Sequence, residues 1–168
     1  AAVADGAVEI GAKAVMGPYP GDSYGGLNHE LRIDPGDYPL VPLDDPASRF
    51  TFDGQVFAVK SGWQNHPMTN VTWFGARAYC SYHGWRLPTE MEWEKAARGT
   101  DGRPYPWGGE LTPNHANFYN SRDPFEDMSN FGSRTTPVGF YGGETHERLM
   151  TYNAASPYGL YDMAGNVW

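Results

Sequence analysis

Residues 86–99 read RLPTEMEWEKAARG and carry the clearest local signal in the chain. The hydroxyl of Thr89 is placed to cap a helix, and Glu92, three residues later, is placed to bond back to the Thr89 amide. Acidic side chains fill the first turns and basic side chains the last, which suits the dipole of a helix. Gly99 then ends the pattern. The stretch predicts a helix that begins after Thr89 and ends at Gly99.

Two further elements are expected just before this helix. Thr72 is placed to cap a helix running from Trp73 to about His83, and Gly84 would stop it. Earlier in the chain, alternating apolar residues flank an Asp-Gly pair over residues 50–59, which is typical of a β-hairpin.

The composition points to a loop-rich domain. Glycine and proline contribute 21 and 14 of the 168 residues, too many for a helical bundle. Residues 1–53 show no sustained period and predict loops with one or two short strands, residues 105–108 and 156–162 predict turns, and residues 136–140 predict a short strand. We expect one domain over residues 1–168, although the first fifty could form a separate arm. Most tryptophans should lie in its core: Trp63, Trp73, Trp85, Trp93 and Trp107.

Charge and hydropathy limit the partners. The formal net charge is -8 and no basic cluster is present, which argues against a nucleic-acid groove. No apolar run approaches the roughly 20 residues that span a membrane. An acidic surface suits an exported protein, periplasmic or extracellular, that binds divalent cations. We expect a protein or peptide partner, within a larger complex.

Cys80 is the single cysteine in the sequence. It cannot form a disulfide within residues 1–168 and is expected to be buried and inert in the first helix. A partner cysteine on a further segment and a reactive thiol remain as alternatives.

Three segments, in this order, resemble the formylglycine-generating enzyme family, whose domain is also called the sulfatase-modifying-factor domain. They are HPMTNVTW at residues 66–73, the string at 86–99 with YPWG at 105–108, and YGLYDMAGNVW at 158–168. The resemblance implies an irregular α+β fold, a variant of the C-type lectin fold with few short strands, two main helices and many loops. Residues 1–53 match poorly, although Val15-Met16-Gly17 resembles the opening strand of the family.

The resemblance also sets expectations about catalysis. Formylglycine generators oxidise a substrate cysteine with copper(I) held by two cysteines, in a part of the family pattern that follows Trp168. We therefore expect the domain to be incomplete at the C-terminus, assign no catalytic residue, and expect a non-catalytic binding or assembly module. One alternative is the copper-dependent oxidase, if a further segment supplies the cysteine pair. Another is a related oxidoreductase that acts on a different substrate.

Calcium is the cofactor that the remaining residues suit best. It takes six to eight oxygen ligands from carboxylates, amides and main-chain carbonyls, which loops supply readily. The resemblance implies calcium sites in two loop regions, with these ligands: Asn117, Phe118, Asp127, Asp162, Gly165 and Val167. Ser129 could replace Asp127. Alternatively, Asn117 and Asp162 only form turns by bonding to their own backbone. The five histidines are scattered and show no close pair at metal-binding spacing.

Overall fold

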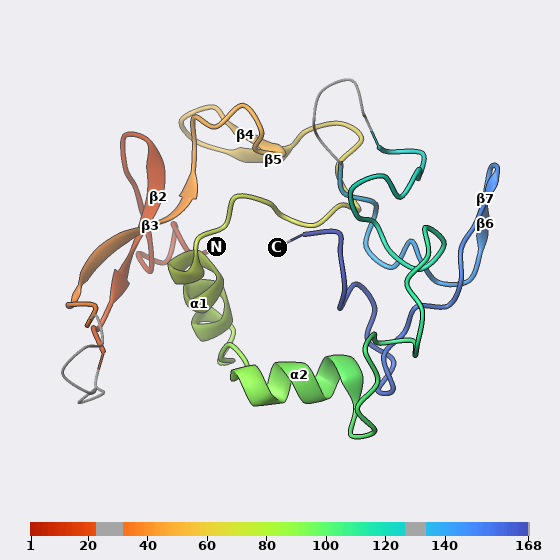
Figure 1. Ribbon diagram of the computed structural model, residues 1–168. Helices are drawn as coiled ribbons and strands as arrows, with labels where there is room; N and C mark the ends of the chain where they lie inside the picture. Colours follow the sequence, from red (N-terminus) through yellow and green to blue (C-terminus); the bar gives the residue numbers. More distant parts are fainter. Residues whose placement is uncertain (23–31, 127–133, 168) are drawn as a thin grey trace. The chain divides into compact units, whose positions relative to one another are not determined.

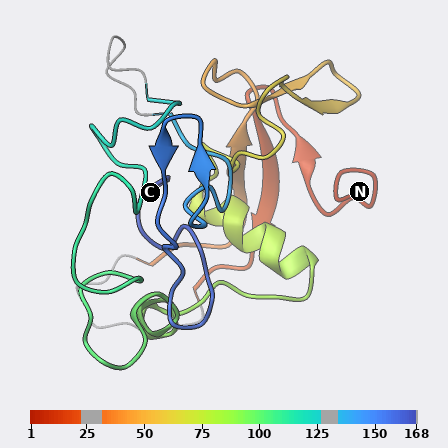
Figure 2. The ribbon, with the colours of Figure 1, turned by 90° about the vertical axis from the view of Figure 1, so that its right-hand side faces the viewer.

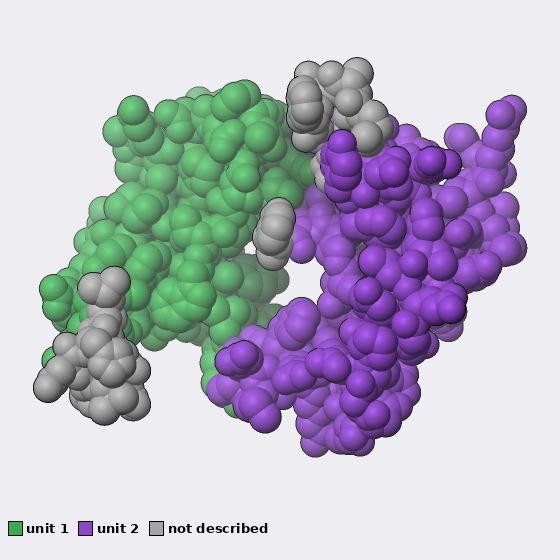
Figure 3. Space-filling model, in the orientation of Figure 1, with its two compact units in different colours: residues 1–60, 68–87 green, residues 61–67, 88–168 purple. Residues whose placement is uncertain are grey.

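The computed structural model describes residues 1–22, 32–126 and 134–167. The chain separates into two compact units, which are coloured differently in Figure 3. Unit 1 comprises residues 1–60 and 68–87, and unit 2 comprises residues 61–67 and 88–168.

Unit 1 contains two small antiparallel sheets (Figure 1). Strands β1 (Glu9–Ile10), β2 (Ala14–Tyr19) and β3 (Gly36–Pro42) form the first sheet in the order β1-β2-β3. Strands β4 (Phe50–Phe52) and β5 (Phe57–Val59) form the second, with Phe50 opposite Val59. The predicted hairpin is therefore confirmed. Its turn is fixed by Asp53, whose Oδ1 accepts hydrogen bonds of 2.9 and 2.8 Å from the amides of Gln55 and Val56.

Helix α1 (Trp73–Tyr82) lies beside the three-stranded sheet of β1, β2 and β3 (Figures 1 and 2). Thr72 caps it, as predicted: its Oγ1 accepts a 3.0 Å hydrogen bond from the Gly75 amide. The same hydroxyl donates to the Pro39 carbonyl at 2.7 Å, so one side chain joins the helix to β3. The close approach requires Gly75, because a Cβ there would lie well under 3.0 Å from the Leu40 carbonyl oxygen.

Aromatic rings fill the junction between β2, β3 and α1. Tyr38 and Phe74 stack with their centroids 4.1 Å apart, and the ring of Tyr19 meets Phe74 edge-on at 5.4 Å. The prediction of a tryptophan-rich core holds only in part: Trp73, Trp85 and Trp93 are 52%, 63% and 49% exposed.

Unit 2 holds helix α2 (Glu90–Arg98) and a hairpin of β6 (Thr145–His146) and β7 (Leu149–Met150). The predicted capping box is confirmed. The Thr89 amide donates to Glu92 Oε2 at 2.9 Å, and the Glu92 amide donates to Thr89 Oγ1 at 3.3 Å. The remaining described residues of unit 2 are turns and loops, including the predicted turn at 105–108, closed by a 3.0 Å bond from the Gly108 amide.

The strand predicted at residues 136–140 is wrong. Pro137 has no amide hydrogen, and its carbonyl accepts a 3.1 Å hydrogen bond from the Phe140 amide. Gly139 has φ of 73°, so the chain turns at this point instead of extending. The overall prediction of two helices, few short antiparallel strands and many loops is confirmed.

Candidate cation site

Two loops expected to bind calcium meet in unit 2. The Asn166 amide donates a 3.0 Å hydrogen bond to the carbonyl of Asn117. Gly165 allows this approach, since a Cβ on it would overlap the same carbonyl oxygen. The Asn166 side chain pairs with the main chain of Thr136, accepting at 2.9 Å and donating at 3.3 Å. The segments around Asn117 and Thr136 are thus both hydrogen-bonded to Asn166.

The Asn117 side chain is 4% exposed and has a defined orientation. Its Nδ2 donates to Asp123 Oδ2 at 3.0 Å and to the Arg134 carbonyl at 2.7 Å. Both amide hydrogens therefore have acceptors, and Oδ1 is the oxygen left for another ligand. In the same loop the Phe118 carbonyl accepts a 2.9 Å bond from the Ser121 amide. A carbonyl has a second lone pair, so this bond still allows it to bind a cation.

Asp162, Gly165 and Val167 form the second predicted ligand group. Asp162 has φ of 56°, and its Oδ2 accepts a 2.7 Å hydrogen bond from the Gly139 amide. This carboxylate thus closes a turn, as the alternative interpretation expects, while its other oxygen makes no hydrogen bond within the described part of the chain. The Gly165 carbonyl accepts a 2.9 Å bond from the Val167 amide. Val167 is 47% exposed.

The structure does not test the expected ligand Asp127 or its alternative Ser129, because both lie outside the described residues. It instead contains a carboxylate that the sequence analysis missed. Asp123 is only 5% exposed. Its Oδ2 accepts from Ser121 Oγ at 2.7 Å as well as from Asn117, and its Oδ1 accepts from the Phe125 amide at 2.8 Å. The Asp-Pro pair at 123–124 signals a turn, and nothing in the local pattern signals burial.

A neighbouring carboxylate closes this loop. Glu126 accepts a 2.6 Å hydrogen bond from the Arg122 amide and a second one from the Asn120 amide. Asn120 and Arg122 have φ of 67° and 61°, so the loop holds two non-glycine residues in the left-handed region. By accepting from both amides, the Glu126 carboxylate stabilises these conformations.

Thr136 and Tyr141 carry two buried hydroxyl groups of unit 2. Tyr141 is 3% exposed; burial, and then the charge of Asp123, raise the pKa of its phenol far above its ordinary value, while Ser121 offsets a small part of the rise. Within the described residues, Tyr141 Oη and Thr136 Oγ1 make no hydrogen bond of normal geometry. Leaving such groups unsatisfied is costly, so a further ligand at this place would stabilise them.

The donor set favours a hard cation. The candidate ligands are amide, carboxylate and carbonyl oxygens in loops, which is the coordination that calcium takes. Across residues 1–22, 32–126 and 134–167 there is no group of three or more histidine, cysteine, aspartate and glutamate side chains able to hold a metal ion. A calcium site here would therefore rely on main-chain carbonyls and amide oxygens. A copper(I) site of two cysteines does not fit residues 1–168, which contain Cys80 alone.

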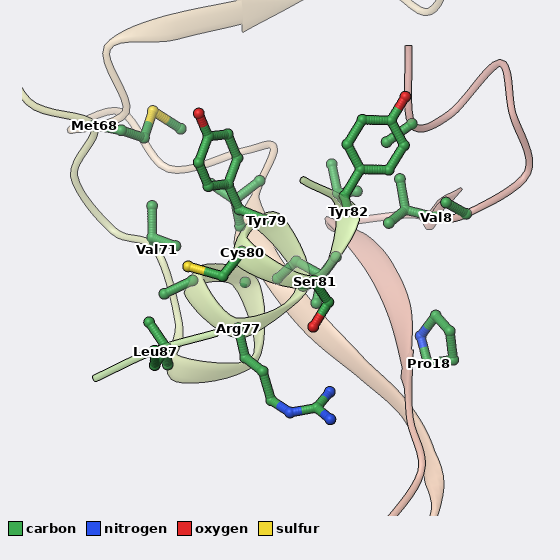
Figure 4. Close-up of a pocket in the computed structure, with 18 residues that line it drawn as sticks. Val8, Pro18, Met68, Val71, Arg77, Tyr79, Cys80, Ser81, Tyr82 and Leu87 are labelled. Atoms are coloured by element: carbon green, nitrogen blue, oxygen red, sulfur yellow. The ribbon is translucent and has the colours of Figure 1, made fainter. Parts of the chain in front are cut away.

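Cys80 lies in unit 1, on an apolar groove that includes none of the candidate calcium ligands. This groove of about 730 Å³ runs along α1, lined among others by Val15, Leu40, Met68 and Tyr79. Cys80 is half-buried on this groove rather than fully buried as predicted. Figure 4 shows the rings of Tyr79 and Tyr82 on one side of the helix and the guanidinium of Arg77 on the other.

Comparison with known proteins decides the family. Residues 46–168 match the family described as the sulfatase-modifying factor enzyme 1-like domain. The chain belongs to this family. The inactive C-alpha-formylglycine-generating enzyme 2 of Bos taurus is 43% identical over 106 residues, and the formylglycine-generating enzyme of Thermomonospora curvata is 44% identical over 107 residues. These matches cover 61% and 62% of the chain, confirming the predicted resemblance to formylglycine-generating enzymes.

The domain also has relatives with other names. A serine/threonine-protein kinase, pkn1 of Chlamydia caviae, is 43% identical over 131 residues, or 77% of the chain. The matched stretches cover 31%, 32% and 17% of the cattle, Thermomonospora and Chlamydia proteins, so the chain spans a third or less of these relatives. In the part of the chain that is described, no helix has the length and apolar character to cross a membrane.

Proposed function

We propose that residues 1–168 form a calcium-stabilised, non-catalytic part of a formylglycine-generating-enzyme-like domain that binds or assembles with a protein or peptide. The observation that carries this proposal is the contrast between the oxygen ligands that a calcium site needs and the cysteine pair that a copper site needs. Oxygen-bearing loops converge around Asn117 and Asn166, whereas residues 1–168 hold one cysteine.

The relatives support a scaffold role for this stretch. The chain is as similar to a protein named inactive, at 43% identity, as to one named an enzyme, at 44%. Similarity at this level thus accompanies both a protein named inactive and one named an enzyme, and fold alone does not fix activity. The matched stretch is therefore proposed to supply structure and binding surface. Export of the protein, expected from its acidic charge, is part of the same proposal.

Calcium would act on the loops of unit 2. Asn117 and Phe118 would supply ligands to a first site, and Asp162, Gly165 and Val167 to a second. A cation at the first site would offset the negative charge of the buried carboxylate of Asp123, which is costly to bury without a positive partner. It would also link loops that have few regular hydrogen bonds of their own.

Thermal unfolding tests the calcium proposal. We expect the melting temperature of the full-length protein to rise with calcium and fall with EDTA, because a ligand bound only to the folded state stabilises it. Asp162→Asn should reduce the calcium-dependent rise. Asp101→Asn, at an exposed carboxylate in the same unit, should leave that rise unchanged. A wild-type melting temperature that responds to neither calcium nor EDTA would refute the proposal.

The binding role makes a separate prediction about the apolar groove of unit 1. A photo-reactive amino acid at position 79, on the groove, should cross-link to a polypeptide partner in the native host, because covering the apolar lining of the groove would remove it from water. The same amino acid at position 119, an exposed tyrosine in unit 2, is the control. The binding role is rejected if both positions give the same pattern.

Copper-dependent oxidation of a substrate cysteine is the second candidate. It is favoured by the 44% identity to the Thermomonospora enzyme. The test is copper(I) binding and aldehyde formation on a cysteine-containing peptide by the full-length protein. Activity in that assay would replace the non-catalytic proposal, and its absence under conditions where a known enzyme of the family is active would reject the oxidase.

A further inference from the structure

We infer that Asp123 is a positioning residue for the calcium site, which orients the Asn117 amide so that its Oδ1 faces the cation. The inference rests on the calcium site proposed above. It concerns a residue that acts through Asn117 and does not itself replace an expected ligand.

The hydrogen bonds of the Asn117 amide define its orientation. Nδ2 lies between two acceptors, Asp123 Oδ2 at 3.0 Å and the Arg134 carbonyl at 2.7 Å. Rotating the amide by 180° would place Oδ1 against both of these oxygens, where it has no hydrogen to share. The observed orientation is therefore strongly preferred, and it directs Oδ1 away from Asp123.

Asp123 is itself held firmly enough to do this. Its two oxygens accept three hydrogen bonds, from Asn117, from Ser121 Oγ at 2.7 Å and from the Phe125 amide at 2.8 Å. With 5% exposure it has little access to water. A buried, fully bonded carboxylate loses little entropy when the metal binds, which is how residues behind a ligand strengthen a metal site.

A second observation points to a ligand at this place. Tyr141 Oη is buried near Asp123 and has no hydrogen bond of normal geometry within the described residues. The charges of Asp123, Glu126 and Asp162 all raise the pKa of the Tyr141 phenol, so three carboxylates lie within electrostatic reach of it. A divalent cation is the chemistry that would offset this concentration of negative charge.

Calcium affinity, measured by isothermal titration calorimetry and by terbium luminescence, tests the inference. In Asp123→Asn, the new amide can present its NH2 group to Asn117 Nδ2, which then loses its acceptor. If the new amide instead presents its oxygen, that oxygen is a neutral and weaker acceptor than the carboxylate. We expect calcium affinity to fall about 10- to 100-fold, the usual effect of losing a residue behind a metal ligand. Asp101→Asn, at an exposed carboxylate of the same unit, is the control, and its calcium affinity should stay close to that of the wild type.

A measurement on the wild-type protein keeps the test decisive if Asp123→Asn unfolds. NMR should find the two Nδ2 hydrogens of Asn117 protected from exchange with solvent by Asp123 and the Arg134 carbonyl, both with and without calcium. Circular dichroism without calcium would verify that each variant is folded.

The outcomes separate the two proposals. A wild-type protein that binds no calcium overturns the proposed calcium site itself. Wild-type binding with an unchanged affinity in folded Asp123→Asn, or Nδ2 hydrogens of Asn117 that exchange freely with solvent in the wild type, overturns the role of Asp123 alone.

Discussion

Gly165 lies against the carbonyl oxygen of Asn117 so closely that any side chain at position 165 would overlap it. This contact joins loops 48 residues apart in sequence, and the adjacent amide of Asn166 completes it with a 3.0 Å hydrogen bond. The loops of unit 2 are thus held by main-chain packing rather than by regular strands.

Gly165→Ala is expected to destabilise the protein. Its φ of 79° is strained for alanine, and the new Cβ would meet Asn117, so the loss should be on the order of 2–4 kcal/mol. Urea unfolding measures this loss. Gly109→Ala is the matched control, because a Cβ there meets nothing within 4 Å, and it should change stability by less than about 1 kcal/mol. Equal effects from the two variants would contradict the contact.

Gly75→Ala should reverse the usual effect of this substitution in a helix. Alanine normally stabilises a helix interior by about 1 kcal/mol relative to glycine. Here the Cβ would overlap the Leu40 carbonyl, so we expect a net loss of about 1–3 kcal/mol in chemical denaturation. Ser81→Ala, at an exposed position of the same helix, should be neutral or slightly stabilising. A stabilised Gly75→Ala variant would show that α1 does not pack this closely on β3.

The capping box of α2 predicts a graded pair of variants. Thr89→Ala removes the hydroxyl that accepts from the Glu92 amide and should cost about 1 kcal/mol in urea unfolding. Thr89→Ser keeps the hydroxyl and should lose only a fraction of this. The interpretation fails if serine is as damaging as alanine.

Asp101 gives a prediction for acid titration. Hydrogen bonds from Arg103 lower the pKa of Asp101 to about 2. Because the folded pKa lies below the unfolded value, the stability from this pair is present above about pH 4 and is lost as the pH falls through about 2. In Arg103→Gln, NMR should find the pKa of Asp101 raised towards its ordinary value. Arg148→Gln, in the turn between β6 and β7, is the control and should leave it unchanged.

Signals within a few residues were sufficient to predict both helices. Thr72 and Thr89 each act on an amide three residues ahead, so the sequence alone locates these helix starts. The hairpin at residues 50–59 is predictable for the same reason, since its turn chemistry is contained in Asp53.

Other features depend on partners that the local pattern does not reveal. The incorrect strand at 136–140 had apolar character, but Pro137 and the long-range bonds of Thr136 to Asn166 decide its conformation. Burial of Asp123 likewise depends on Asn117 and Tyr141, which only the folded chain brings near it. Strands β2 and β3 pair across an intervening segment that has no periodic signal of its own.

The bond between Thr72 and β3 also affects how the protein behaves at high concentration. β3 is an outer strand of its sheet, and such strands invite pairing with other molecules. Here Pro39 and Pro42 offer no amide hydrogens, and Thr72 occupies the carbonyls of Pro39 and Leu40. The strand therefore has little free hydrogen-bonding capacity along this stretch, so aggregation through it is disfavoured for as long as the start of α1 stays in place.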